Sequence, residues 1–494
     1  MQPKRPHPRA DLIRIAVQTM NERGLEPEFP PRALAQLAQL EVGLNDDVSE
    51  AVIRDLTALP WCSIDNDDSL DLDQLTACEV LAQGAIRLWV AIADVDALVK
   101  KDTPIDAHAR TNTTSVYTSA RIFSMLPERL STDLTSLNPG VIRFAVVTEM
   151  VFNADGSLAG AAVYRARVQN KAKLAYDAVS DWIDSKGPLP APAAAVPGMD
   201  AQLRTQDSLA QQLRARRHAE GSLELETFQP RVVFDGERVV DIRDQAHNRA
   251  RQLIEEVMIV TNGCTARYLA SHGVVSLRRV VRSPERWLRI VAVAKEYGVA
   301  LPADPDSRAL EAFLARQHQR DPLRFPDLSL VIVKLMGRGE YVVETPGGGA
   351  PIGHFGLAVR DYTHSTAPNR RYPDLITARL LKATLAGQPQ PYSPAELAHL
   401  AEHCTRQEDA AQKVERHMRK SEAALLLETR IGQRFDAIVT GVGQGGVWVR
   451  LLSPPAEGKL VRGDGDLKVG QKVRVKLLST SVEQGFIDFE LADR

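Results

Sequence analysis

The sequence predicts an α+β protein with three parts. Residues 1–60 carry apolar side chains at helical spacing, and residues 61–428 mix strand-like and helical patterns. Residues 429–494 contain short strand-like runs between glycine-rich turns, a pattern typical of a small β-barrel. A chain of 494 residues is long enough for this division, because single domains typically hold about 100–200 residues.

The amino-terminal part is predicted to hold three short helices. Apolar residues recur at helical spacing over Leu12–Met20, Leu34–Leu40 and Asp46–Leu59. Three such helices resemble a helix-turn-helix or winged-helix module. The alternative is a plain helical lead-in that packs on the next domain, and the pattern alone does not separate the two.

The central part is predicted to contain a sheet and several helices. The turns at Gln83-Gly84 and Asn153–Gly156 each join two strand-like runs into a hairpin. The expected strands are residues 75–81, 86–93, 141–152 and 161–171. The expected helices are residues 250–270, 374–386 and 394–429, and the proline-rich residues 186–198 are expected to form an exposed loop.

The carboxy-terminal part fits a five-stranded barrel of the OB type. Its strand-like runs are residues 435–440, 446–451, 472–479 and 485–491. Trp448 lies within the second run, two residues from the basic Arg450. An exposed aromatic ring on such a barrel can stack on a nucleic-acid base, whereas the alternative is a tryptophan in the barrel core.

Composition and charge limit the binding partners and the cellular compartment that the sequence allows. The formal net charge of −2 gives no global sign of a polyanion partner, so any nucleic-acid surface must be local. The four cysteines lie far apart and lack zinc-site spacing, which predicts reduced thiols in a cytoplasmic protein. No apolar run resembles a signal sequence or is long enough to span a bilayer, so we expect no membrane partner.

The most informative segment is the acidic run Ile64–Gln74. Its five carboxylates are Asp65, Asp67, Asp68, Asp71 and Asp73. Carboxylates this close raise one another's cost of ionisation, and a cation removes that cost. Oxygen ligands alone favour Mg²⁺ or Mn²⁺ over zinc. The alternative is an acidic solvated loop, but Ile64, Leu70 and Leu72 are expected to anchor the run in a core.

A second candidate segment lies about three hundred residues later. Arg370 and Arg371 follow a proline turn and precede a helix that starts near Asp374. Rigid guanidinium groups at such a junction are suited to bidentate phosphate binding. The alternative is that both arginines pair with structural carboxylates.

These segments resemble the motifs of the ribonuclease II family. The acidic run resembles the family's catalytic aspartate signature. The other matches, in the family's order, are Val90–Val95, Met125–Pro127, Leu134–Leu137, Ile254–Ile259 with Asn262, and Ala367–Asp374. The resemblance covers about residues 61–428, and an RNA-binding barrel of the ribosomal-protein type is expected after it. The resemblance to this family implies an RNB catalytic domain and magnesium-dependent 3′→5′ hydrolysis of RNA to nucleoside 5′-monophosphates.

The resemblance also assigns catalytic roles. It implies that Asp65, Asp71 and Asp73 are acidic site residues and metal ligands, with Asp73 the most critical for the chemistry. It implies that Arg370 holds the scissile phosphate and stabilises its developing charge. Gln74 stands where the family has its last signature aspartate. Its carbonyl can still ligate Mg²⁺, or Mn²⁺ in its place, but brings no charge, so affinity for one ion should fall. Compensation by Asp67 or Asp68 is a hypothesis.

Five residues form the predicted RNA-binding set. Tyr117 matches the aromatic residue that stacks on the 3′-terminal base, and Glu255 matches a glutamate near the penultimate nucleotides. Leu225 stands where the family has a second aromatic clamp, and leucine should stack less well. Arg371 and Trp448 complete the set.

The amino terminus departs from the family. Bacterial members usually carry two cold-shock barrels there, which help form the opening for single-stranded RNA. The short helical segment leads to the hypothesis that this opening also accepts duplex RNA with a 3′ overhang, and hence RNA with secondary structure. We expect a monomer that binds RNA 3′ ends, with basic stretches such as Arg278–Arg289 holding the RNA backbone.

Two other functions are compatible with parts of the sequence. The first is a catalytically weak or inactive RNA-binding regulator on the same scaffold, which Gln74 and Leu225 favour. The second is an unrelated magnesium phosphohydrolase with an Asp-x-Asp pair, which leaves Arg370 and the barrel unexplained.

Overall fold

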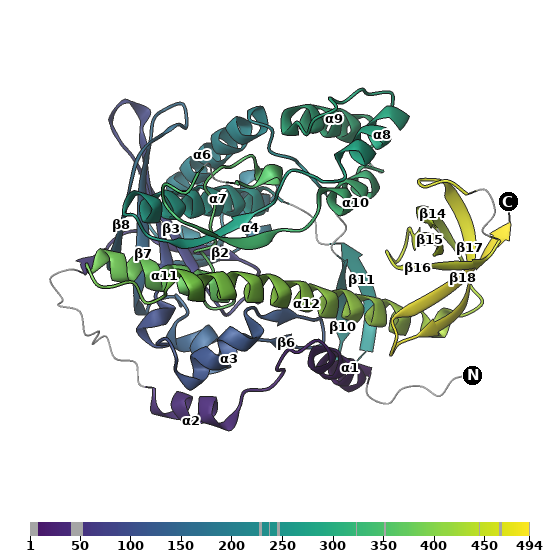
Figure 1. The fold of residues 1–494 in the computed structure, drawn as a ribbon, viewed down its shortest axis with the longest axis horizontal. Helices are drawn as coiled ribbons and strands as arrows, with labels where there is room; N and C mark the ends of the chain where they lie inside the picture. Colours follow the sequence, from purple (N-terminus) through teal and green to yellow (C-terminus); the bar gives the residue numbers. More distant parts are fainter. Residues whose placement is uncertain are drawn as a thin grey trace.

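The computed structural model places a central sheet, a long helix and a barrel in sequence order (Figure 1). The described residues are 8–40, 53–226, 230–236, 238–244, 248–322, 324–349, 352–443, 445–463 and 467–493. No helix within these ranges is both long enough and apolar enough to cross a membrane.

The central domain is built on a seven-stranded sheet with the order β1-β8-β7-β4-β3-β2-β9. Its strands are β1 (Arg54–Asp55), β2 (Cys62–Asp65), β3 (Gln74–Val80), β4 (Ile86–Ala93), β7 (Ile142–Phe152), β8 (Leu158–Gln169) and β9 (Ala172–Ala175). Strands β3, β4, β7 and β8 pair antiparallel, whereas β2–β9 and β1–β8 are parallel. Both predicted hairpins are therefore confirmed, and the sheet is mixed.

Each face of the sheet is covered by its own set of helices. One core cluster contains α3 (Pro104–Asn112), α11 (Tyr372–Leu385) and the first part of α12 (Pro394–Leu427). The cluster on the other face contains α4 (Tyr176–Ile183), α5 (Ala191–Ala194), α6 (Met199–Ala219) and α7 (Arg249–Ser271). Helix α5 lies inside the expected loop 186–198 and buries Ala193 in this core, so that loop is only partly exposed.

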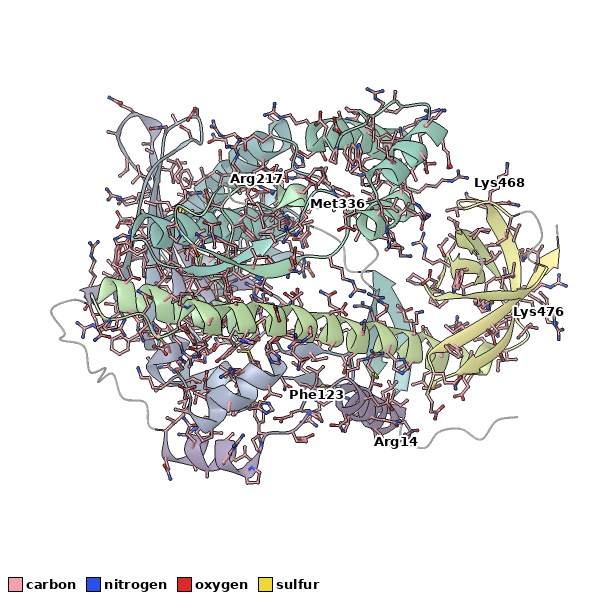
Figure 2. All side chains as sticks on the ribbon, in the orientation of Figure 1. Arg14, Phe123, Arg217, Met336, Lys468 and Lys476 are labelled. Atoms are coloured by element: carbon pink, nitrogen blue, oxygen red, sulfur yellow. The ribbon has the colours of Figure 1, made fainter. Side chains whose placement is uncertain are left out.

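Helix α12 joins the central domain to the barrel. It has 34 residues and is about 50 Å long at ~1.5 Å per residue. Its first half packs in the core of the central domain, and its second half packs with the barrel and the amino-terminal helix α1. Figure 2 shows Arg217 and Met336 on one side of this helix and Arg14 and Phe123 on the other. The sequence places the boundary between the central domain and the barrel near residue 428. The end of α12 and the barrel share one hydrophobic core across this boundary.

The carboxy-terminal barrel is closed, with strand order β14-β15-β16-β18-β17. Its strands are β14 (Arg434–Gly443), β15 (Gly446–Leu451), β16 (Glu457–Arg462), β17 (Lys472–Ser481) and β18 (Phe486–Asp493). The five-stranded architecture is confirmed, although β16 has no counterpart among the four runs identified in the sequence.

The amino-terminal helices do not form a compact module. Helix α1 (Pro8–Glu22) packs with the barrel and α12, whereas α2 (Pro31–Gln39) packs with α3 and the central core. Part of the predicted third helix, residues 46–52, lies outside the described residues. Its end is not helical, because Arg54–Asp55 is an edge strand on β8. The plain lead-in is therefore correct for the described residues.

The remaining elements form smaller units. Helices α8 (Trp287–Glu296), α9 (Ser307–Arg320) and α10 (Phe325–Met336) have a core of their own. Three two-stranded sheets are made by β5 (Val116–Tyr117) with β6 (Ile122–Phe123), β10 (Pro230–Asp235) with β11 (Arg238–Asp244), and β12 (Ser276–Val280) with β13 (Glu340–Glu344).

Candidate active site

The acidic run forms the connection between β2 and β3. Asp65 ends β2, and its Oδ1 accepts hydrogen bonds from the Asn66 amide (2.7 Å) and the Ser69 hydroxyl (2.9 Å). These bonds turn the chain, so the run is not extended. Asp67 and Asp68 are exposed at this turn.

Apolar residues anchor the run only in part. Ile64 and Leu72 are buried, as expected, but Leu70 is 56% exposed. The serine of the Leu134–Leu137 match supplies the missing anchor. Ser136 Oγ accepts from the Leu72 amide (2.9 Å) and donates to the Leu70 carbonyl (2.8 Å). Both neighbours of Asp71 are thereby held. The sequence identified the segment containing Ser136 only as a family match, without a role for it.

Asp73 is buried and directly paired with the arginine segment. The Asn369 amide donates to Asp73 Oδ1 at 2.9 Å, and Arg370 Nε lies 3.5 Å from Asp73 Oδ2. Burial raises the pKa of Asp73 to about 7, and the nearby Asp71 acts in the same direction against Arg370. Burial also raises the pKa of Asp71, with Asp65 adding to the effect. The two distant segments thus meet, as the sequence predicts.

The two arginines have different surroundings. Arg371 Nη2 donates to the buried Asp374 at 2.7 Å, and Asp374 also accepts from the Ala367 amide at 2.9 Å. Arg371 therefore pairs with a structural carboxylate, the alternative foreseen for it. The Arg370 side chain is 44% exposed and keeps access to a ligand.

Tyr117 is brought to the same place by backbone pairing. The Ser115 amide donates to the Arg370 carbonyl (3.0 Å), and the Tyr372 amide donates to the Thr113 carbonyl (2.8 Å). The Tyr117 side chain is 40% exposed. Burial of its hydroxyl raises the pKa of Tyr117. The charge of Arg370 lowers this pKa, and the charges of the three aspartates Asp65, Asp71 and Asp73 raise it.

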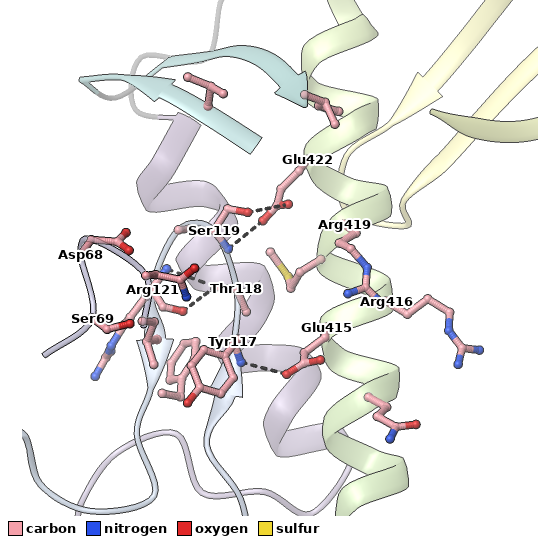
Figure 3. A pocket seen from close by; sticks show the side chains of 18 of the residues that line it. Asp68, Ser69, Tyr117, Thr118, Ser119, Arg121, Glu415, Arg416, Arg419 and Glu422 are labelled. Atoms are coloured by element: carbon pink, nitrogen blue, oxygen red, sulfur yellow. Dashed lines mark hydrogen bonds between the residues drawn. The ribbon is translucent and has the colours of Figure 1, made fainter. Parts of the chain in front are cut away.

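A cavity of about 3840 Å³ opens in front of these residues. It is lined by Asn66–Asp71 of the acidic connection, by Tyr117, by α12 and by the barrel residue Trp448. Asp65, the buried Asp73 and Arg370 are not among its lining residues. Figure 3 shows Asp68, Ser69 and Tyr117 on one side and α12 on the other. Parts of the chain more than three hundred residues apart thus share one wall.

Trp448 lies on the outer face of the barrel. Its neighbours Val447 and Val449 are buried, whereas Trp448 is half-buried and lines the cavity. The Lys459 ammonium lies 6.0 Å from the indole ring centre. The alternative of a tryptophan in the barrel core is therefore wrong.

The other predicted RNA contacts are less well placed. Leu225 packs against the core of α8–α10. Glu255 is exposed on α7, whereas its neighbour Glu256 is buried and accepts from Arg217 Nε at 2.8 Å. In the basic stretch, Arg278 and Arg279 pair with Glu344 (3.2 Å) and Glu408 (2.6 Å), so they are structural rather than free for RNA.

The acidic residues fit a hard divalent cation by their chemistry. Asp65, Asp71 and Asp73 offer only oxygen ligands, which suit such an ion. Their carboxylate oxygens do not all lie within 4.8 Å of one another in the described structure. Gln74 is half-buried, and its side-chain amide makes no hydrogen bond with the rest of the described chain.

The fold combines an α+β domain, which brings the acidic run and the arginine segment together, with a closed five-stranded barrel. The RNB domain family matches residues 53–387, and the RNase II-type exonuclease C-terminal S1 domain matches residues 433–492. The chain belongs to the RNB-domain, or ribonuclease II, family.

Similar proteins support this assignment. Ribonuclease R of Vibrio cholerae is 30% identical over 94% of this chain and 60% of its own length, so the chain spans less than two thirds of that relative. RNase R of Mycoplasma genitalium, solved with ribose-methylated single-stranded RNA, has a TM-score of 0.88 at 24% identity and covers 97% of this chain and 78% of its own. Yeast Ssd1, described as a pseudonuclease, has a TM-score of 0.70 at 17% identity and covers 90% of this chain and 55% of its own.

Proposed function

We propose that this protein is a magnesium-dependent exoribonuclease that hydrolyses RNA from the 3′ end to nucleoside 5′-monophosphates. The observation that carries the proposal is the contact between Asp73 and Arg370 (3.5 Å), with Asp71 beside it. Membership of the family supports the same activity.

Each group has a proposed task. Arg370 binds the scissile phosphate and neutralises charge that develops on it. Asp65, Asp71, Asp73 and Gln74 would hold magnesium. When bound, this ion supplies the charge that activates the attacking water and stabilises the leaving 3′-oxygen.

Tyr117 and Trp448 are proposed to bind bases at two places on the cavity. Tyr117 stacks on the 3′-terminal base near the acidic residues, and Trp448 stacks on a base farther along the strand. Contacts to the ribose 2′-hydroxyl favour RNA over DNA. The remaining three predicted residues are proposed to shape the surroundings of the RNA rather than to bind its bases. They are Arg371, Leu225 and Glu255.

The substrate is proposed to be the 3′ end of single-stranded RNA, and duplex RNA with a 3′ overhang is a second candidate. The size of the cavity, about 3840 Å³, supports the second. A hairpin RNA with a short 3′ overhang tests it. Degradation into the stem is expected, and a stop before the stem would limit the substrate to single strands.

One experiment tests the activity itself. Labelled single-stranded RNA is incubated with magnesium and either the native protein or the Asp73→Asn variant. Mononucleotide release by the native protein alone, with RNA binding kept by the variant, is the expected result. Binding without turnover in both would point to the regulator. Hydrolysis of small phosphoesters but not RNA would point to the phosphohydrolase.

A further inference from the structure

The hairpin that carries Tyr117 is held by two carboxylates of α12. Strands β5 and β6 form this hairpin, and its tip is closed by the Thr118 hydroxyl, which donates to the Arg121 carbonyl at 2.6 Å. Glu415 accepts from the Tyr117 amide at 3.0 Å. Glu422 accepts from the Ser119 amide (3.2 Å) and hydroxyl (3.1 Å). Figure 3 shows these bonds side by side.

The spacing of the two glutamates explains how one helix reaches both places. They are seven residues apart, which is about two helical turns, so they lie on the same face of α12. Two attachments along one hairpin fix its orientation as well as its position. One attachment is at the backbone amide of Tyr117 itself and the other is two residues later, at Ser119. The Tyr117 ring therefore has a defined place on the cavity wall.

Glu422 is unusual because it is fully buried. No lysine or arginine within the described ranges lies within 4.0 Å of its carboxylate, and Ser119 is its only hydrogen-bond partner in that part of the chain. A buried carboxylate without a direct ion pair is costly for stability, and among the charged groups of the described residues only the more distant Arg419 favours its ionised form. Glutamine would fill the same space and keep both hydrogen bonds without a charge, whereas an apolar residue would leave the Ser119 amide and hydroxyl without this partner.

The amino-terminal segment holds the opposite side of the hairpin. Arg9 Nε donates to the Ala120 carbonyl at 3.1 Å, and Arg121 pairs with Glu28 through bonds of 2.6 and 3.1 Å. Ala120 and Phe123 share a core cluster with α1. The hairpin is thus clamped between α12 and the amino terminus, and the Ser119–Glu422 contact is the buried part of the clamp.

We propose that Glu422 and Ser119 form a clasp that positions Tyr117 to stack on the 3′-terminal base, which makes Glu422 a positioning residue for substrate recognition. The inference rests on the proposed function, because it takes RNA as the ligand of Tyr117. It adds a residue that does not touch the RNA but sets the strength of base recognition.

The test compares two RNAs that differ only in their last nucleotide, which is either normal or abasic. Affinities are measured by fluorescence anisotropy in the full-length Asp73→Asn protein, which cannot consume the RNA. Stacking predicts that the normal RNA binds about 5- to 150-fold more tightly than the abasic one. Tyr117→Ala should bring this ratio close to one.

Variants of the clasp then separate positioning from general damage. Glu422→Ala should lower the ratio toward that of Tyr117→Ala. Ser119→Ala, which removes one of the two bonds, should lower it by about two-fold or more. Glu422→Gln should keep most of it, because the amide can accept from the Ser119 amide and donate to its hydroxyl. Glu402→Ala, an exposed glutamate on the same helix, is the matched control.

The outcomes are distinct. If Glu422→Ala and Ser119→Ala keep the parent ratio while Tyr117→Ala loses it, the clasp is wrong and the proposed function stands. If the parent protein binds neither RNA, the proposed function fails and the clasp fails with it. Circular dichroism checks that Glu422→Ala folds. If this variant does not fold, the binding ratio of Ser119→Ala alone tests the clasp.

Discussion

The buried carboxylate of Glu422 makes the stability of the protein depend on pH in a way that can be calculated. Burial raises the pKa of Glu422 to about 7 from its ordinary value of 4.5, against the effect of the Ser119 hydrogen bonds. The folded protein therefore holds this proton more tightly than the unfolded chain does. The resulting stability is fully present below pH 4.5 and is lost as the pH rises through about 7. The difference between the two pKa values corresponds to about 3 kcal/mol.

The Glu422→Gln variant isolates this contribution, because glutamine does not ionise. We expect the free energy of unfolding of the variant, relative to the native protein, to increase by about 2–3 kcal/mol between about pH 5 and pH 8. Urea unfolding at several pH values measures it, with Glu402→Gln as the exposed control. A difference between variant and native protein that stays constant over this range would refute the reasoning, because Glu422 would then remain ionised in the folded state.

Three further predictions concern the site. Trp448→Ala should weaken binding of single-stranded RNA by about 5- to 150-fold in an anisotropy titration, with little loss of stability because the ring lies outside the barrel core. Arg370→Lys should lower kcat by about 10²–10³-fold in a mononucleotide-release assay, since lysine cannot form the bidentate contact, and an unchanged kcat would remove Arg370 from the chemistry. Chelation with EDTA should stop turnover, and Gln74→Asp should lower the magnesium concentration that restores it. Unchanged metal dependence would count against Gln74 as a ligand.

Local patterns in the sequence were sufficient for most of the fold. The hairpins around Gln83-Gly84 and Asn153–Gly156 and the helices near α7, α11 and α12 follow from residue spacing and turn chemistry, which depend on neighbours in the chain. The prediction was wrong where long-range packing decides. Residues 53–59 have helical spacing, but β8 recruits Arg54–Asp55 as an edge strand.

The site was predictable only in outline. The motif match brought Asp73 and Arg370 together correctly, because it reflects the whole fold rather than local spacing. It gave no reason to select Ser136, whose hydroxyl accepts from the Leu72 amide, or position 369, whose backbone amide donates to Asp73. Such contacts join residues tens to hundreds of positions apart, and a serine or asparagine has no periodic pattern that would distinguish it. The exposure of Leu70 was missed for the same reason.

Helix α12 connects the two proposed base-binding positions mechanically. Glu415 and Glu422 attach the Tyr117 hairpin to it, and its last turns pack in the same core as the barrel that carries Trp448. A helix fixed at both ends by packed cores moves as a unit, because close-packed interiors deform little. RNA that engages Trp448 and Tyr117 together therefore binds two sites on one rigid frame, whose separation is set by the helix rather than by the loops between them.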